Sequence, residues 1–308
     1  MTVVSLLGPQ RPTPYVKETF DSLGVTGPVA TIRAGWQEQE PDDADLDAHL
    51  GGSRNLRLYI RWLDVLDRDP EFFAADRQRM AVLREMQDIY TVRLDYALQA
   101  VYAVQRRPGH PDVHAAELAD ALAAVRALDD HHFDQTQAVH AEFYAAYPPD
   151  ERDVVVEHRN AIARALADSP GVAIAGGHVA VLINCLHLFN IAALAGDRPV
   201  VAWSAGAMAV AERVVLFHDR APQGPGHPEV LDAGLSLVHG IVPLPHARRR
   251  LLIDDHVRMA VLAQRFAPAA CVPLDQGARV DYAAGATTCP PGVLAIDEDG
   301  RVAARAAA

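Results

Sequence analysis

The chain has 308 residues, of which 50% are hydrophobic, so it is long enough to bury one large core or two smaller ones. Asp and Glu outnumber Lys and Arg by 40 to 28, and the resulting net charge of -12 disfavours nucleic acid and anionic membranes as partners. The three cysteines form no CxxC pair, which disfavours a disulfide framework and favours a reducing compartment.

Neither the N-terminal residues nor the uncharged stretch at 169–196 favours secretion or a membrane-spanning segment. The first residues lack the basic region of a signal peptide. Residues 169–196 carry no charge, but the glycines at 176 and 177 divide them into a strand and a helix with polar side chains that would be costly in lipid. We therefore expect a cytoplasmic protein without a membrane partner, and no motif predicts a cofactor or a metal.

The first part of the chain, residues 1–59, alternates strand and helix. Apolar runs predict strands at 3–7 and 29–33, with a helix near 13–23 between them and a short helix after the acidic turn EQEPDDADLD. This is the start of a βαβ arrangement.

Residues 60–149 follow the 3.6-residue helical period instead. Met80, Leu83, Met86 and Tyr90 share one stripe. Breaks at RRPGHP (106–111) and at YPP (147–149) divide the region from 60 to 168 into three helices, of which the first two are long. We expect these two to form an inserted helical hairpin.

Within the hairpin, the stretch DDHHFDQTQAVH at 129–140 is rich in histidine. A metal site would pair His132 with His140 and Asp134, but these histidines lack the i, i+4 spacing that places two imidazoles on one ion. The spacing favours a solvated helix face over a metal site.

Strand and helix alternate again in residues 150–308. Apolar runs predict strands that end near residues 175, 203, 244 and 274, followed by ARVDY and a hairpin that turns at DEDG. Right-handed crossovers then imply an α/β fold, in which a doubly wound, mostly parallel sheet lies between two helical layers in a three-layer αβα arrangement.

Ser204 lies in VVAWSAGAMAV, where a strand turns directly into a helix that we expect to extend to about Phe217. Such a turn crowds the backbone, and the flanking residues are small. The pattern is typical of a nucleophile elbow, which exposes a hydroxyl above the sheet. A serine that only caps the helix is the alternative.

Other polar groups end neighbouring strands, where ligands bind in parallel sheets. His246 is placed to act as the base for Ser204, and Asp275 or Gln276 supplies an acid or amide. The backbone N–H groups of Gly177 and Ala205 are candidates for an oxyanion hole.

The runs AGGHVAVL, AWSAGAMAV, VPLPHARRRL and CVPLDQGARV, in this order, resemble peptidase E and cyanophycinase. These are serine hydrolases of the class I glutamine amidotransferase-like, flavodoxin-like fold. The resemblance covers residues 1–50 and 150–285. It implies that Ser204 is the nucleophile, His246 the base, and Gly177 with Ala205 the oxyanion donors.

The acid of the family matches Gln276, and an amide cannot stabilise an imidazolium by charge. Asp275 is adjacent, and Pro273 with Gly277 favours an early end to the strand, so Asp275 is the better candidate for the negative charge. Ala202 replaces the glycine that the family usually has, and the hairpin has no counterpart there.

The sequence therefore predicts a serine hydrolase that cleaves a small peptide or related amide, including an aspartyl one, through an acyl-enzyme on Ser204. The alternative is a weak or inactive member of the fold that binds a small molecule or a partner. Arg250 is expected to pair with a substrate carboxylate, and His178 to contact the substrate. The hairpin is expected to act as a lid or as the interface of a homodimer.

Overall fold

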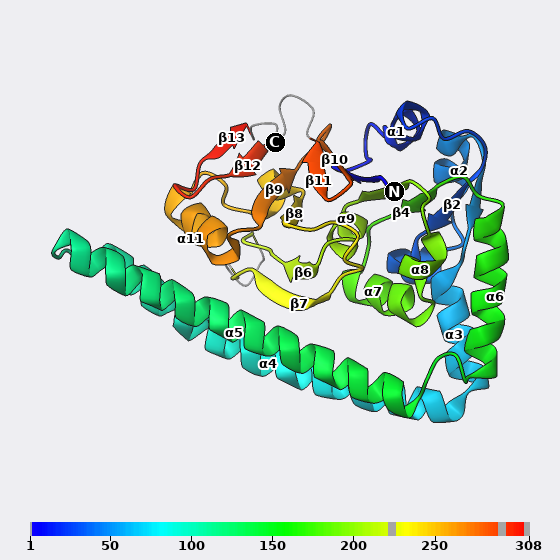
Figure 1. Ribbon diagram of the computed structural model, residues 1–308, viewed down its shortest axis with the longest axis horizontal. Coiled ribbons are helices and arrows are strands. Elements are labelled where there is room, and N and C mark those ends of the chain that lie inside the picture. Colours follow the sequence, from blue (N-terminus) through cyan, green and yellow to red (C-terminus); the bar gives the residue numbers. More distant parts are fainter. Residues whose placement is uncertain (1, 221–225, 289–293, 305–308) are drawn as a thin grey trace.

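The computed structural model describes residues 2–220, 226–288 and 294–304. Seven strands form its central sheet, namely β1 (Val4–Leu7), β2 (Val29–Ile32), β3 (Ser53–Asn55), β4 (Val172–Ile174), β5 (Val200–Trp203), β10 (Arg279–Ala283) and β11 (Ala286–Thr288). Their order is β11-β10-β1-β5-β4-β2-β3 (Figure 1). The neighbouring strands β1, β5, β4, β2 and β3 pair in parallel, whereas β10 pairs antiparallel with β1 and β11. The predicted α/β fold with a mostly parallel central sheet is confirmed.

Both faces of the central sheet are buried. In β5, Val200 and Ala202 pack into one apolar cluster, while Val201 and Trp203 pack into another on the opposite face. Successive strand residues point to opposite faces, so two clusters require cover on both sides. This explains why the strands read as continuous apolar runs.

Helices provide that cover. One face packs against α1 (Val16–Ser22) and α2 (Ala44–Leu50). The other packs against several helices, namely α3 (Leu58–Arg68), α6 (Asp153–Ala167), α7 (Val179–Leu188), α8 (Ile191–Ala195) and α9 (Ala205–Ala209). A 3₁₀ segment, Ala34–Gln39, follows β2.

The inserted hairpin consists of α4 (Pro70–Arg106) and α5 (Pro111–Ala146), and its tip extends beyond the α/β body (Figure 1). The prediction of three helices in this region was wrong, because a third break, at Asp69, separates α3 from α4 and makes four helices. The Asp69 side chain accepts a hydrogen bond from the Phe72 backbone N–H, and Pro70 has no N–H to continue the preceding helix.

A buried polar network ties the hairpin to the rest of the protein. Arg265, on α11 (His256–Phe266), donates to both carboxylate oxygens of Asp129 at 2.7 Å, and the Tyr90 hydroxyl donates to the same carboxylate at 2.8 Å. The side chains of Arg265 and Asp129 are 1% and 4% exposed. A hinge motion of the hairpin would leave these buried charges without their partners, which disfavours a hinged lid.

The histidines of the hairpin correct another prediction. His132 is buried, stacks on Tyr90 with ring centroids 4.0 Å apart and hydrogen-bonds with the side-chain amide oxygen of Gln87. His140 pairs with Asp232 at 3.0 Å. The prediction of a solvated face was wrong for both residues, because this side of α5 packs against α4 and against β7 (Glu229–Ala233).

The region after the elbow also differs from the prediction. The helix α9 ends at Ala209, and residues up to Phe217 contain β6 (Arg213–Leu216), which pairs antiparallel with β7. The expected helix to Phe217 was wrong because Val214 and Val215 are both buried in a short strand pair.

The later strands do not extend the central sheet. β8 (Ile241–Pro245) and β9 (Ala270–Leu274) pair in parallel with each other as a separate sheet, which corrects the expectation of one continuous doubly wound sheet. β8 leads into the short helix α10 (Ala247–Arg250). The predicted terminal hairpin at DEDG is confirmed as β12 (Leu294–Ile296) and β13 (Val302–Ala304).

Cys185 and Cys271 are buried free thiols, and burial raises the pKa of Cys271 to about 12. Cys289 lies outside the described residues. Within the described ranges, no helix has the length and apolar character needed to cross a membrane.

Candidate active site

Ser204 occupies a strained turn between β5 and α9. Its φ and ψ are 55° and -128°, which is rare for a residue with a side chain. The turn fits only because its neighbours are small. A Cβ on Gly206 would come within 2.2 Å of the Ile174 carbonyl oxygen, and a Cβ on Gly176 within 2.6 Å of the Ser204 Cβ. The small residues in the sequence are therefore required by the geometry of the elbow.

His246 follows β8 and meets Ser204 across the site. The Ser204 Oγ lies 2.9 Å from the His246 Nε2, although the residues are 42 positions apart in the chain. A left-handed conformation at His246, with φ 58°, turns the chain after the strand, and its N–H donates to the Leu274 carbonyl. This is the contact that a hydroxyl nucleophile and its base require.

The environment of His246 favours its uncharged ring. Burial lowers the pKa of His246 below its usual value, and the nearby cations Arg250 and Arg249 lower it further, while Asp275 opposes them. A base with a lowered pKa remains able to accept a proton at mildly acidic pH.

Two backbone N–H groups border the hydroxyl. Ala205 begins α9, and Gly177 has a φ of 115° that a side chain would strain. In the described parts of the chain, neither N–H forms a backbone hydrogen bond. A Cβ on Gly177 would also come within 2.2 Å of the Gly35 carbonyl oxygen, so this position requires glycine. Both N–H groups are available to a substrate oxygen.

The two acid candidates lie in different surroundings. One carboxylate oxygen of Asp275 accepts from the Arg248 backbone N–H at 3.1 Å, and the other lies 3.6 Å from the Arg248 Nε. The Gln276 amide instead donates to the Thr13 carbonyl at 2.8 Å and is exposed. Among the described residues, no side chain hydrogen-bonds to the His246 Nδ1.

A cavity of about 460 Å³ opens beside the hydroxyl and includes Gly177, Ala205 and Arg250 in its lining. Arg250 is half-buried, burial lowers its pKa, and its guanidinium has no ion-pair partner in the described ranges. An unpaired cation at this position suits a carboxylate on the substrate.

The sequence did not identify the other polar residues of this cavity. His218, His227 and Glu229 line it from the segment around β6 and β7. This segment was expected to begin with helix, and no motif marks its polar side chains. Only their position in space identifies them.

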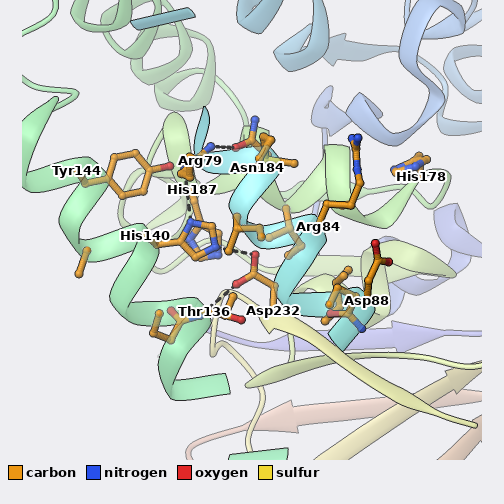
Figure 2. Close-up of a pocket in the computed structure, with 18 residues that line it drawn as sticks. Arg79, Arg84, Asp88, Thr136, His140, Tyr144, His178, Asn184, His187 and Asp232 are labelled. Atoms are coloured by element: carbon orange, nitrogen blue, oxygen red, sulfur yellow. Dashed lines mark hydrogen bonds and ion pairs between the residues drawn. The ribbon is translucent and has the colours of Figure 1, made fainter. Parts of the chain in front are cut away.

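His178 lies in a second, neighbouring cavity of about 720 Å³, between the hairpin and α7 (Figure 2). It caps α7, where its Nδ1 accepts from the Val181 N–H at 3.3 Å. The structure therefore brings Ser204, His246, Gly177, Ala205 and Arg250 together, and places His178, at the N-cap of α7, in the neighbouring cavity.

No cluster of three or more His, Cys, Asp or Glu side chains suited to a metal ion occurs among the described residues. In comparisons with known proteins, no family model matches the chain, and no curated protein matches it.

Proposed function

We propose that this protein is a serine hydrolase that cleaves a small peptide or related amide through an acyl-enzyme on Ser204. The observation that carries the proposal is the 2.9 Å contact between the Ser204 Oγ and the His246 Nε2, with Ser204 strained into an elbow. The resemblance to peptidase E and cyanophycinase supports this proposal. On the same resemblance we propose that the fold is of the class I glutamine amidotransferase-like type. We propose a cytoplasmic location, where buried free thiols stay reduced.

The chemistry follows from the positions of these groups. The Ser204 oxygen attacks the carbonyl carbon of the amide while His246 takes the hydroxyl proton. The N–H groups of Gly177 and Ala205 stabilise the negative oxygen of the tetrahedral intermediate. His246 then gives its proton to the leaving amine, which leaves the acyl group on Ser204. Water, deprotonated by His246, releases the acid and restores the hydroxyl.

The substrate is proposed to carry a carboxylate that pairs with Arg250. This cation lines the same cavity as Ser204, and its partial burial makes an unpaired charge costly until a ligand neutralises it. Dipeptides with an N-terminal Asp should be cleaved faster than those with Ala or Lys, and Arg250→Ala should remove the preference. Equal rates across the panel would contradict this assignment.

A fluorophosphonate probe tests the nucleophile directly. The wild-type protein should form one covalent adduct on Ser204, mapped by mass spectrometry, and Ser204→Ala should form none. Ser236→Ala provides the control, because Ser236 also has a positive φ, at 51°, but has no hydrogen bond to a histidine among the described residues. Labelling that is absent in wild type, or unchanged in Ser204→Ala, would overturn the hydrolase proposal.

The second candidate function is a binding protein that keeps the fold without efficient catalysis. It is favoured by one observation: Asp275 and Gln276 hydrogen-bond to Arg248 and Thr13 rather than to His246. An imidazole without an acid partner is a poorer base. In that case substrate analogues should bind in the Ser204 cavity, while the fluorophosphonate reaction is absent.

We also propose that the hairpin pairs with a second copy of this chain. On α4, Val82, Ile89 and Tyr96 recur every seven residues, and together with Val92 they form an exposed apolar stripe. The stripe lies on the side of α4 away from the buried residues Tyr90 and Leu94.

Antiparallel pairing of two copies about Ile89 would match this surface to itself. Residues equally distant from the centre would face each other, so Val82 would meet Tyr96 of the partner subunit, and Glu85 would meet Arg93 of the partner subunit. Apolar residues would then meet apolar residues, and opposite charges would pair.

A further inference from the structure

The larger cavity lies outside the proposed catalytic machinery and has walls from separate parts of the chain. Figure 2 shows α4 and α5 on one side, with α7 and β7 completing the enclosure. Its volume of about 720 Å³ is in the range of sites for small organic molecules. Much of the lining is apolar, from Met80, Leu83, Ala141, Ala180, Ile183 and Leu231. A space of this size and composition favours an organic ligand over an ion.

The buried charges of this cavity already have countercharges within the protein. Arg79 is 5% exposed and donates to Asp76 at 2.5 Å and to the side-chain amide oxygen of Asn184 at 2.6 Å. Asp232 accepts from Gln137 and pairs with His140. A charged ligand would lose its hydration without gaining an unpaired countercharge in the interior.

The remaining charges of the lining lie at its exposed rim. Arg84 and Asp88 are one helical turn apart on α4, have opposite signs and are solvent-exposed. Their formal charges cancel, and both side chains stay hydrated because they are exposed. The charge distribution of the cavity therefore favours an uncharged ligand.

Asn184 and Tyr144 offer hydrogen-bond donors inside the cavity. Asn184 uses its carbonyl oxygen for Arg79, and its amide N–H₂ has no partner in the described ranges. The Tyr144 side chain points from α5 toward Arg79 and His187, and burial raises its pKa, which keeps the phenol protonated (Figure 2). These donors call for a carbonyl or hydroxyl oxygen on the ligand.

We propose that this cavity is a binding site for an uncharged, mainly aromatic or aliphatic small molecule with a carbonyl or hydroxyl oxygen at one end. The apolar body packs between α4, α5 and α7, and the oxygen accepts from Asn184 and Tyr144. The site does not depend on the hydrolase proposal, because none of its binding groups takes part in the chemistry at Ser204.

The site also borders the Ser204 cavity. The first turn of α7 separates them, with Gly177 and Val179 facing one and His178 facing the other. A hydrogen bond of 3.0 Å joins Gln87, which lines the larger cavity, to Glu229, which lines the smaller one. The two cavities are neighbours with separate linings.

Fluorescence titration with prodan, an uncharged naphthalene ketone, tests the site. Wild-type protein should bind one equivalent saturably, with the blue shift of an apolar environment. Ala141→Phe fills the space and should weaken binding at least about tenfold. Ala145→Phe, one turn later on the same face of α5 but outside the lining, should bind like wild type. If Ala141→Phe fails to fold by circular dichroism, Ala180→Leu fills the same space from α7.

Two further measurements test the class of ligand. Asn184→Asp keeps the acceptor for Arg79 but removes the amide donor, so prodan should bind about three- to tenfold more weakly. The anion anilinonaphthalene sulfonate should bind wild type much more weakly than prodan does. The proposal is overturned if prodan shows no saturable binding, if Ala141→Phe binds it as tightly as wild type, or if the anion binds equally well. Unchanged affinity in Asn184→Asp would overturn the assigned polar contact.

Discussion

The Asp275 carboxylate accepts a hydrogen bond from the backbone N–H of Arg248, two residues beyond the proposed base His246. This contact holds the negative charge near the imidazole without a hydrogen bond to the ring. Asp275 raises the pKa of His246 against the opposite effects of burial and the two arginines. The carboxylate thus acts on His246 through the electrostatic field and does not orient it.

Substitution of Asp275 should therefore reduce turnover only moderately. Asp275→Asn removes the charge that compensates the imidazolium, and we expect a loss of about ten- to a hundredfold in kcat, smaller than the ~10⁴ seen where the acid bonds directly to the base. The measurement is steady-state hydrolysis of the best acidic dipeptide.

Gln276→Glu is the matched variant. The Gln276 amide donates to the Thr13 carbonyl, so a glutamate there loses one exposed hydrogen bond and should leave kcat unchanged within about twofold. A large gain from Gln276→Glu beside an unaffected Asp275→Asn would mean that the acid position belongs to residue 276.

The pH dependence of activity should reveal the environment of His246. Because burial and the adjacent cations lower its pKa, the ring stays neutral as pH falls, and the acid limb of kcat/KM should lie below pH 6.5, the usual value. Arg250→Gln removes one cation, so the pKa should rise and the acid limb should move to higher pH.

Arg248→Gln serves as the comparison in the same segment. Arg248 is largely exposed and lies beside Asp275, and it is not among the charges that lower the pKa of His246. The acid limb of kcat/KM in Arg248→Gln should match that of wild type. An acid limb above pH 6.5 in wild type, or one that does not move in Arg250→Gln, would contradict the described electrostatics.

The sequence predicted the parts of the fold that depend on local patterns. Apolar runs identified the strands β1, β4 and β5, and the small residues around Ser204 identified the elbow. It failed where long-range pairing decides the structure. The segment after Ala209 is a strand because β7 lies beside it, and His132 is buried because α4 and α5 pack together.

In the candidate site, too, the sequence predicted the residues that local patterns mark and missed those that long-range pairing places. Ser204 and His246 end strands, and strand ends converge by topology. Glu229 and His227 line the cavity through a strand pair that no local pattern indicated. The directions of the Asp275 and Gln276 side chains depend on single turns, which residue spacing does not determine.

Removal of one partner of the buried pair between Asp129 and Arg265 should strongly destabilise the protein. Asp129→Asn leaves the Arg265 guanidinium buried without its countercharge, and the free energy of unfolding should fall by about 3–5 kcal/mol. Urea unfolding monitored by circular dichroism measures this change.

An exposed ion pair provides the comparison. Arg54 and Asp168 are 3.0 Å apart with side chains 42% and 68% exposed, so Asp168→Asn should cost about 0–1 kcal/mol. Equal costs for the two variants would show that the hairpin is not anchored by its buried charges.

The apolar stripe on α4 should control the oligomeric state. The side chains of Ile89, Val92 and Tyr96 are each more than half exposed, at 54%, 58% and 68%. Ile89→Glu places a charge at the centre of the proposed antiparallel contact, where the two copies of residue 89 would face each other and repel. Light scattering should give the mass of a dimer for wild type and that of a monomer, 33.3 kDa, for the variant.

Val113→Glu is the control, because Val113 is similarly exposed, at 60%, but lies on α5 outside the stripe, and this variant should remain dimeric. A wild-type monomer at micromolar concentrations, or a dimer that persists in Ile89→Glu, would show that a second copy does not cover this face.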